Sequence, residues 1–66
     1  MIRDTGLTSM EVQVLDLLAQ HLENKEIASA LSISASLTQK LVLSAYRKLG
    51  VSRRTEAAVL WSRLRP

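Results

Sequence analysis

The stretch that decides the fold is Asn24-Lys25-Glu26-Ile27-Ala28-Ser29-Ala30-Leu31, followed by Ser32-Ile33-Ser34 and a longer segment that ends at Gly50. Apolar residues recur at helical spacing in the first segment, and Ser32-Ile33-Ser34 interrupts the pattern. Ser34 is a good N-cap, because its hydroxyl can accept a hydrogen bond from the next helix, and Gly50 supplies a left-handed stop. The sequence therefore predicts helices over about 25–31 and 35–49, joined by a short turn, as in a helix-turn-helix motif.

A further helix is predicted before this pair. Thr8-Ser9-Met10-Glu11 fits a capping box, in which the threonine hydroxyl and the glutamate carboxylate satisfy each other's backbone N–H groups. Leu7 and Val12 stand where a hydrophobic staple would pair them. Apolar residues follow at helical spacing: Val14, Leu15, Leu18 and Leu22. We expect this helix over about 9–20.

Two other caps are polar residues that precede apolar segments. Asn24, or less favourably Glu23, can cap the helix over about 25–31. Ser52 can cap a fourth helix over about 53–64, whose inward face is expected to carry Ala57, Leu60, Trp61 and Leu64. Strand signals are missing, since the sequence has one Tyr, one Trp and no Phe. We therefore expect a single all-α, four-helix domain over residues 1–66, with its core over about 7–64.

Size and composition exclude several classes of protein. With 66 residues there is room for one small core, so stability must come from helix packing, helped by a partner subunit or by the rest of a longer protein. Cysteine is absent and His21 is the one histidine, so we expect no disulfide, metal site or cofactor. The sequence shows no Gly-rich phosphate loop, no paired carboxylates and no nucleophile with a nearby base, and we expect no enzyme activity.

Neither a membrane span nor an export signal is visible in the sequence. No apolar run approaches the ~20 residues that cross a bilayer. The segment from Met1 to Gly6 lacks the apolar core and the small-residue cleavage site of a signal peptide. We therefore expect no membrane partner and a cytoplasmic location.

Charge is distributed unevenly along the chain. Nine Lys and Arg oppose six Asp and Glu, which gives a formal net charge of +3. Five of the six acidic residues lie at or before Glu26, and seven of the nine basic residues lie at or after Lys40. A basic second half is what a surface that binds a polyanion requires, although solvated helix faces remain the alternative.

A helical wheel over residues 35–49, at about 100° per residue, separates two faces. The inward face is expected to carry Ala35, Thr38, Leu41, Val42, Ala45 and Leu49, and the outward face Ser36, Gln39, Lys40, Leu43, Ser44 and Arg47. The outward face is basic and free of acids, and an α-helix fits the major groove of DNA. Gln39 can pair with adenine, and the serines can bond to bases or phosphates. Lys40 and Arg47 can reach guanine edges or phosphates, and Leu43 can contact a thymine methyl.

Polar and basic residues at the helix starts are candidates for phosphate contacts. Lys25 lies in the first turn of its helix, where the N–H groups and the dipole favour a phosphate, whereas a lysine there is unfavourable for the helix itself. Arg53 and Arg54 begin the fourth helix, where each either clamps a phosphate or pairs within the chain with Glu56 or another acid. We favour the internal role for Arg54. Asn24 is the remaining candidate.

Three segments of the sequence, at matching separations, resemble one family. Leu7-Thr8-Ser9-Met10-Glu11 is similar to its opening Leu-Thr-x-Arg-Glu. Asn24-Lys25-Glu26-Ile27-Ala28, with Leu31, Ile33 and Ser34, is similar to its Asn-Lys-Glu-Ile-Ala-x-x-Leu-x-Ile-Ser, and Lys48-Leu49-Gly50-Val51 with Arg54-Thr55-Glu56-Ala57 to its Lys-Leu-Gly-Val-x-x-Arg-Thr-Glu-Ala. The family is the LuxR/FixJ-type, or GerE-type, helix-turn-helix domain. The resemblance covers Leu7 to about Arg63.

This resemblance implies a bacterial, sequence-specific DNA-binding domain that regulates transcription, with the helix over about Ala35–Leu49 in the major groove of double-stranded DNA. In the resembled family the fourth helix provides the dimer contact, which here implies a weak homodimer through Thr55, Ala58, Val59 and Ser62. Trp61 is expected in the core. The chain is either a free-standing regulator or the effector end of a protein with an attached receiver or sensor domain, associated with the nucleoid when bound.

The sequence departs from the family's pattern in the helix expected to bind DNA. It has Leu37-Thr38-Gln39-Lys40-Leu41 and Ala45 where the family usually has Thr-Val-Lys-x-His and Ile, and His21 where Gly is usual. Leu37 and Leu43, both outside the expected core face, motivate an alternative function: a LuxR-like module that binds a protein and no longer binds DNA. A sigma-factor-like helical pair is a third possibility, against which the Gly50-Val51 link and the fourth helix argue.

Overall fold

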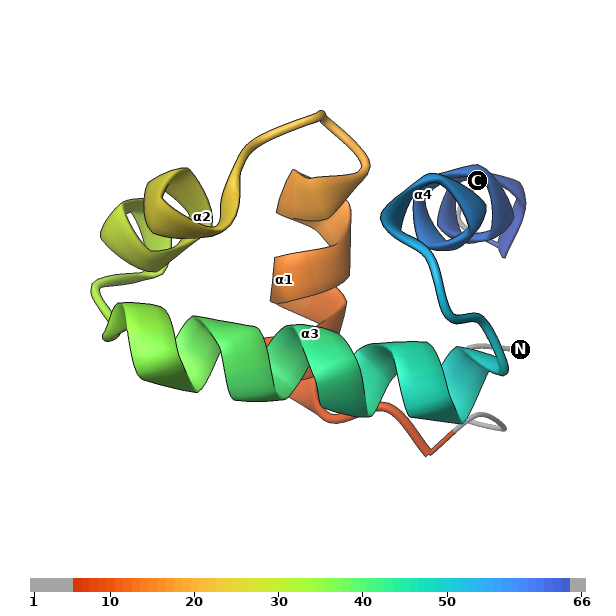
Figure 1. The fold of residues 1–66 in the computed structure, drawn as a ribbon, viewed down its shortest axis with the longest axis horizontal. Coiled ribbons are helices and arrows are strands. Elements are labelled where there is room, and N and C mark those ends of the chain that lie inside the picture. The colour runs from red at the N-terminus through yellow and green to blue at the C-terminus, as the bar shows by residue number, and fades with distance from the viewer. Residues whose placement is uncertain (1–5, 65–66) are drawn as a thin grey trace.

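The computed structural model describes residues 6–64, which form four helices without a strand (Figure 1). The helices are α1 (Ser9–Leu18), α2 (Asn24–Leu31), α3 (Ala35–Leu49) and α4 (Arg54–Leu64). α3 packs against α1 and α2, and α4 packs against α1. In Figure 1, α3 runs along one side of the molecule, α1 crosses behind it, and α2 and α4 lie towards its two ends. The all-α, four-helix fold expected from the sequence is confirmed.

Two clusters of buried side chains hold the helices together. The first brings residues of all four helices together: Val14, Leu18, Ile27, Val42 and Ala57. The second contains Leu15, Ala45 and Trp61, and Leu7 and Val12 pack against it. The Trp61 side chain is 1% exposed, and its Nε1–H donates to the Asp16 carboxylate at 2.8 Å. Trp61 is therefore the core residue that the sequence predicted, and it fixes α4 to α1.

The starts of α1 and α3 follow the predicted caps. The Thr8 N–H donates to Glu11 Oε1 at 2.8 Å and the Glu11 N–H donates to Thr8 Oγ1 at 3.2 Å, which confirms the capping box. The Leu37 N–H donates to Ser34 Oγ at 3.0 Å, which confirms the N-cap of α3.

The starts of α2 and α4 differ from the prediction by one residue. Glu23, not the preferred Asn24, is the N-cap of α2, because its N–H donates to the Glu26 carboxylate at 2.8 Å in a capping box. α4 begins at Arg54 rather than 53, since the first helical hydrogen bond of this turn is accepted by the Arg53 carbonyl. Ser52 lies one residue too early to be that cap.

The first three helices end in the same way, with one residue in the left-handed region. His21 has φ 68°, Ser32 has φ 57° and Gly50 has φ 73°. At each end, the N–H of the left-handed residue and that of the next residue donate back to carbonyls of the last turn, which is the Schellman pattern. α1 therefore stops at Leu18, earlier than the expected 20, because the last residues before His21 form the closing turn.

Two residues expected on inward faces are exposed. Ala35 is the first residue of α3, and Leu64, the last of α4, is 37% exposed. Both are end residues, where the neighbouring helices no longer cover the wheel position that faces the core elsewhere along the helix.

No single helix among residues 6–64 is long and apolar enough to cross a bilayer. The α2–α3 pair meets the length and composition test only when it is counted as one segment, and that segment is bent by 108°. Within the same residues, no group of three or more His, Asp or Glu side chains is placed to hold a metal ion.

A candidate nucleic-acid interface

α2 and α3 are set at a fixed angle by the three residues between them. The chain bends by 108° from one helix to the next. Ser32 makes this possible with its left-handed backbone, and the Ile33 N–H donates to the Ala28 carbonyl at 3.0 Å. Ser34 then caps α3. Two short helices at about 90–120°, joined by a turn of three or four residues, have the geometry of a helix-turn-helix.

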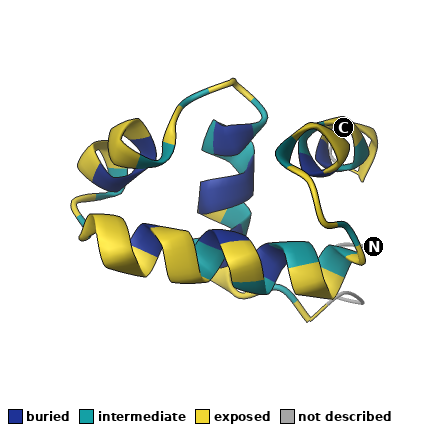
Figure 2. Ribbon diagram, viewed as in Figure 1, coloured by how far each residue is buried: buried dark blue, intermediate teal, exposed yellow. Residues whose placement is uncertain are grey.

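α3 presents one face that no other helix covers. Ser36, Gln39, Lys40, Leu43 and Arg47 are exposed, and we call these five residues the outward face of α3. The buried Thr38, Val42 and Ala45 lie on the opposite side. Figure 2 shows exposed residues along the length of α3, interspersed with the buried ones. The sequence of α3 contains two basic residues on this face and no acidic residue anywhere, so the face is cationic.

Ser44 is the one member of the predicted outward face that the structure turns inward. Its side chain is half-buried, and its Oγ donates to Glu11 Oε2 at 2.6 Å. Lys48 also reaches this carboxylate, with Nζ 2.7 Å from Glu11 Oε1. Ser44 therefore ties α3 to α1, and its half-buried side chain lies closer to the inward face than the helical wheel predicted.

Glu11 is a buried carboxylate whose charge is fully compensated. The residue is 2% exposed. Burial alone raises the pKa of the Glu11 carboxyl, but the hydrogen bonds from Lys48, Ser44 and the Thr8 backbone, together with the charge of Lys48, lower it from 4.5 to about 2. Because the ion pair with Glu11 compensates the charge of Lys48, the cationic character of α3 at the surface rests on Lys40 and Arg47.

Four basic residues are exposed, and their side chains form no hydrogen bond or ion pair with another residue of the described range 6–64: Lys25, Lys40, Arg47 and Arg53. Lys25 lies in the first turn of α2, next to the N–H groups that begin this helix. Arg53 immediately precedes α4. These cations are therefore available to an anionic partner.

Arg54 has the internal role that the sequence analysis favoured. Its Nη1 donates to Asn24 Oδ1 at 2.9 Å, and its Nη2 donates to the Leu22 carbonyl. The guanidinium thus joins the start of α4 to the loop before α2, and its partners are an amide and a backbone carbonyl rather than Glu56. Asn24 and Arg54 are committed to each other in this arrangement.

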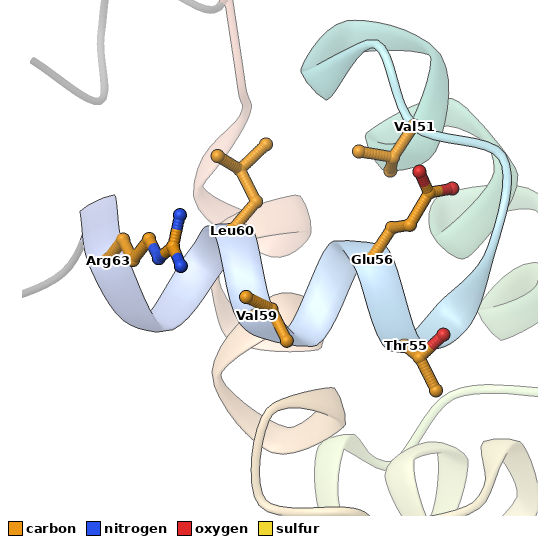
Figure 3. A pocket seen from close by; sticks show the side chains of 6 residues that line it. All are labelled: Val51, Thr55, Glu56, Val59, Leu60 and Arg63. Carbon is orange, nitrogen blue, oxygen red and sulfur yellow. The ribbon is translucent and has the colours of Figure 1, made fainter.

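The outer side of α4 carries a small apolar surface. Thr55, Val59 and Ser62 are exposed, Val59 by 53%, and Ala58 is half-buried. A shallow, open depression of about 440 Å³ runs along one side of Val59 and is lined by Val51, Thr55, Glu56, Val59, Leu60 and Arg63 (Figure 3). A smaller one of about 180 Å³ lies on its other side, between α4 and the end of α1. Val59 is therefore a ridge between two depressions.

The fold and this uncovered cationic helix define the chain as a helix-turn-helix domain. The family model described as bacterial regulatory proteins, luxR family, matches residues 5–61. The chain belongs to the luxR family of bacterial regulatory proteins, a class of DNA-binding regulators of transcription and not a class of enzymes.

Curated relatives agree with this assignment. The chain is 38% identical over 61 residues to the DNA-binding transcriptional activator DevR/DosR of Mycobacterium tuberculosis, and 40% identical over 57 residues to the transcriptional regulatory protein YdfI of Bacillus subtilis. It is 38% identical over 64 residues to the HTH-type transcriptional regulator MalT of Yersinia pestis. These matches cover 92%, 86% and 97% of the chain, but 28%, 27% and 7% of the relatives.

Lys48 is the residue that the sequence analysis missed. Its position in the last turn of α3 was treated as part of the Lys-Leu-Gly-Val motif alone, whereas its ammonium group closes the buried network around Glu11. The only local signal was the capping box at Glu11, because Lys48 and Ser44 lie 37 and 33 residues away in the chain.

Proposed function

We propose that this domain binds double-stranded DNA with α3 in the major groove, as the part of a bacterial regulator of transcription that recognises the target sequence. The outward face of α3 carries the proposal, because it is uncovered, cationic and free of acids along three turns of helix. Gln39, Lys40 and Arg47 supply donors and acceptors that match base edges, and Leu43 supplies an apolar contact. Ser36, in the first turn, is close enough to the helix start to bond to a phosphate.

Phosphate contacts orient the helix in the groove. Lys25 in the first turn of α2 and Arg53 just before α4 are next to Asn24 and Arg54, which are hydrogen-bonded to each other, so both cations can contact phosphates near the place where α2 and α4 begin. Helix N-termini favour phosphates through their free N–H groups and dipole. We assign the phosphate contacts to these two cations, and not to Asn24 and Arg54, whose polar groups bond to each other.

We further propose that α4 joins two copies of the domain. Thr55, Ala58, Val59 and Ser62 form a small patch, which fits a weak homodimer that is stabilised when both copies bind adjacent half-sites about one turn of DNA apart. Because the chain spans about a quarter or less of the length of the relatives reported above, we propose that a receiver or sensor domain attached to it controls this pairing inside the bacterial cell.

Fluorescence anisotropy with a labelled duplex at two salt concentrations tests the proposed function. We expect log K to fall by about 0.9 for each phosphate neutralised per tenfold increase in salt. Lys40→Glu/Arg47→Glu should weaken binding strongly. Arg47→Glu and Arg63→Glu change the net charge equally, but Arg63 lies on α4, so Arg63→Glu should weaken binding much less than Arg47→Glu. Indistinguishable curves for the wild type and the double variant would overturn the proposal.

The alternative, a protein-binding module, is motivated by the exposure of Leu37 and Leu43, at 41% and 51%. On the helical wheel these two side chains lie about 120° apart, at about 100° per residue, with Lys40 between them. They therefore do not form a continuous apolar strip of the kind that a protein partner would cover. If the domain shows no salt-dependent binding to DNA in the experiment above, the protein-binding function is favoured instead.

A further inference from the structure

Leu43 lies at the centre of the outward face of α3. At about 100° per residue, all four other members of the face fall within about 60° of it. Gln39 precedes it by one turn, Lys40 lies beside it, and Arg47 follows it by one turn. The Leu43 side chain is 51% exposed. If Lys40 and Arg47 enter the major groove of DNA, the Leu43 side chain must therefore enter it too and face the base edges.

A leucine at this place selects one chemical group. Base edges in the major groove present hydrogen-bond donors and acceptors, and the only apolar group among them is the C5-methyl of thymine. Opposite any other edge, Leu43 would remove water from a polar group without offering a hydrogen bond, which is unfavourable. The leucine therefore favours thymine by contact and disfavours the other bases by desolvation.

Gln39 extends this preference to a second base pair. A glutamine side chain can bond in a bidentate manner to N6 and N7 of adenine. Residues four apart are separated by about 6 Å along a helix, and stacked base pairs by about 3.4 Å, so Gln39 and Leu43 address base pairs that are neighbours or next but one. Neither side chain has a competing partner in the described part of the chain.

We propose that each half-site contains a thymine whose methyl group contacts Leu43, and an A·T pair one or two steps away whose adenine bonds to Gln39. This inference rests on the proposed function, since it names the bases that the outward face of α3 selects.

Replacing thymine by uracil removes the methyl group and nothing else. Duplexes are first selected from a random pool by the chain itself, and each thymine of one half-site is then replaced singly by uracil. At one position we expect the wild type to lose about fourfold in affinity, which corresponds to one buried methyl group. Leu43→Ala should bind the thymine and uracil duplexes equally. Leu37→Ala removes the other exposed leucine of α3 and should keep the fourfold difference.

The outcomes separate this inference from the function on which it rests. If no uracil weakens the wild type, or if Leu43→Ala loses as much affinity as the wild type at the same position, the thymine contact is wrong. The proposed function then stands, provided that binding still falls with salt and with Lys40→Glu/Arg47→Glu. If the chain selects no duplex and binds none, both are wrong. Circular dichroism of both leucine variants confirms that the exposed substitutions leave the helices intact.

Discussion

Glu11 connects the start of α1 to the second half of α3 through one buried carboxylate. It closes the capping box with Thr8, accepts a hydrogen bond from Ser44 and pairs with Lys48. Removing one partner of a buried charged network leaves the others without compensation. We expect Glu11→Gln to lower the free energy of unfolding by about 2 kcal/mol in urea titrations. Glu56→Gln, at an exposed position on α4, is the matched control and should change stability by less than about 0.5 kcal/mol.

The pKa of Glu11 also predicts how the domain responds to acid. The pKa is about 2 in the folded state against 4.5 ordinarily, so the unfolded state binds the proton first. The stabilisation by this carboxylate is therefore complete above 4.5 and is lost as the pH falls towards 2. Urea unfolding across this pH range should show a stability loss that Glu11→Gln reduces. An equally steep loss in the variant would show that other carboxyl groups dominate.

For single residues, the sequence predicts hydrogen bonds between neighbours in the chain better than contacts between residues far apart in the chain. The hydrogen bonds of Thr8 with Glu11 and of Ser34 with Leu37 follow from spacing of three residues, and both are present. The contacts of Glu11 with Ser44 and Lys48 depend on how α1 crosses α3, which no local pattern contains. The wheel position of Ser44 was misjudged for that reason.

At the scale of the helix, the backbone conformation of the residue that ends each helix affects stability. Three helices end with a left-handed residue, but only one of the three is glycine. His21 and Ser32 adopt this conformation at a cost of about 1 kcal/mol each, because a Cβ atom crowds the following carbonyl. We expect His21→Gly and Ser32→Gly to raise the free energy of unfolding by up to about 1 kcal/mol each.

Gly50→Ala is the converse substitution and should lower the free energy of unfolding by about 1 kcal/mol. A Cβ atom at Gly50 meets no other atom within 4 Å, so the whole effect comes from φ 73° and none from a clash. Urea titrations of the three variants compare these stops directly. If Gly50→Ala stabilises the domain, or if His21→Gly and Ser32→Gly both destabilise it, the left-handed conformation does not determine the stability of these helix ends.

The element boundaries show where sequence patterns are sufficient. The 35–49 helix is predicted to the residue, because a serine N-cap and a glycine stop enclose it. α1 ends earlier than predicted, since a histidine in the left-handed region leaves no signal as clear as glycine. The N-cap of α2 was assigned to Asn24 on propensity, whereas the glutamate capping box with Glu26 places it at Glu23. The angle of 108° between α2 and α3 is not contained in either helix alone.

The proposed pairing of two copies through α4 is a property of the whole molecule. The α4 patch is small, with Val59 as its most exposed apolar residue at 53%. We expect Val59→Glu to abolish cooperative binding to a duplex with two half-sites, because a charge then faces its own symmetry copy across the interface. Binding to a duplex with one half-site should be unchanged, and serves as the internal control. Equal loss on both duplexes would place Val59 in the DNA contact or in the fold.

The whole-molecule charge distribution was visible in the sequence before the structure. A basic second half predicted a cationic surface, and exposed Lys40 and Arg47 provide it on one face of α3. The sequence did not show that Lys48 pairs with Glu11. It favoured an internal role for Arg54, but it did not show that the partners are Asn24 and the Leu22 carbonyl. Counting charges therefore overestimated how many cations of this half are free to contact DNA.

An NMR titration of the ¹⁵N-labelled domain with a selected duplex tests the central claim most directly, because it locates the contact surface residue by residue. We predict that the largest shifts of backbone amides and of the Gln39 side-chain amide occur along the outward face of α3 and at Lys25, and that the shifts diminish as salt is added. The NMR signals of amides on the outer side of α4 should not shift when the duplex has only one half-site. Shifts confined to α4, or none at saturating duplex, would contradict the placement of α3 in the major groove.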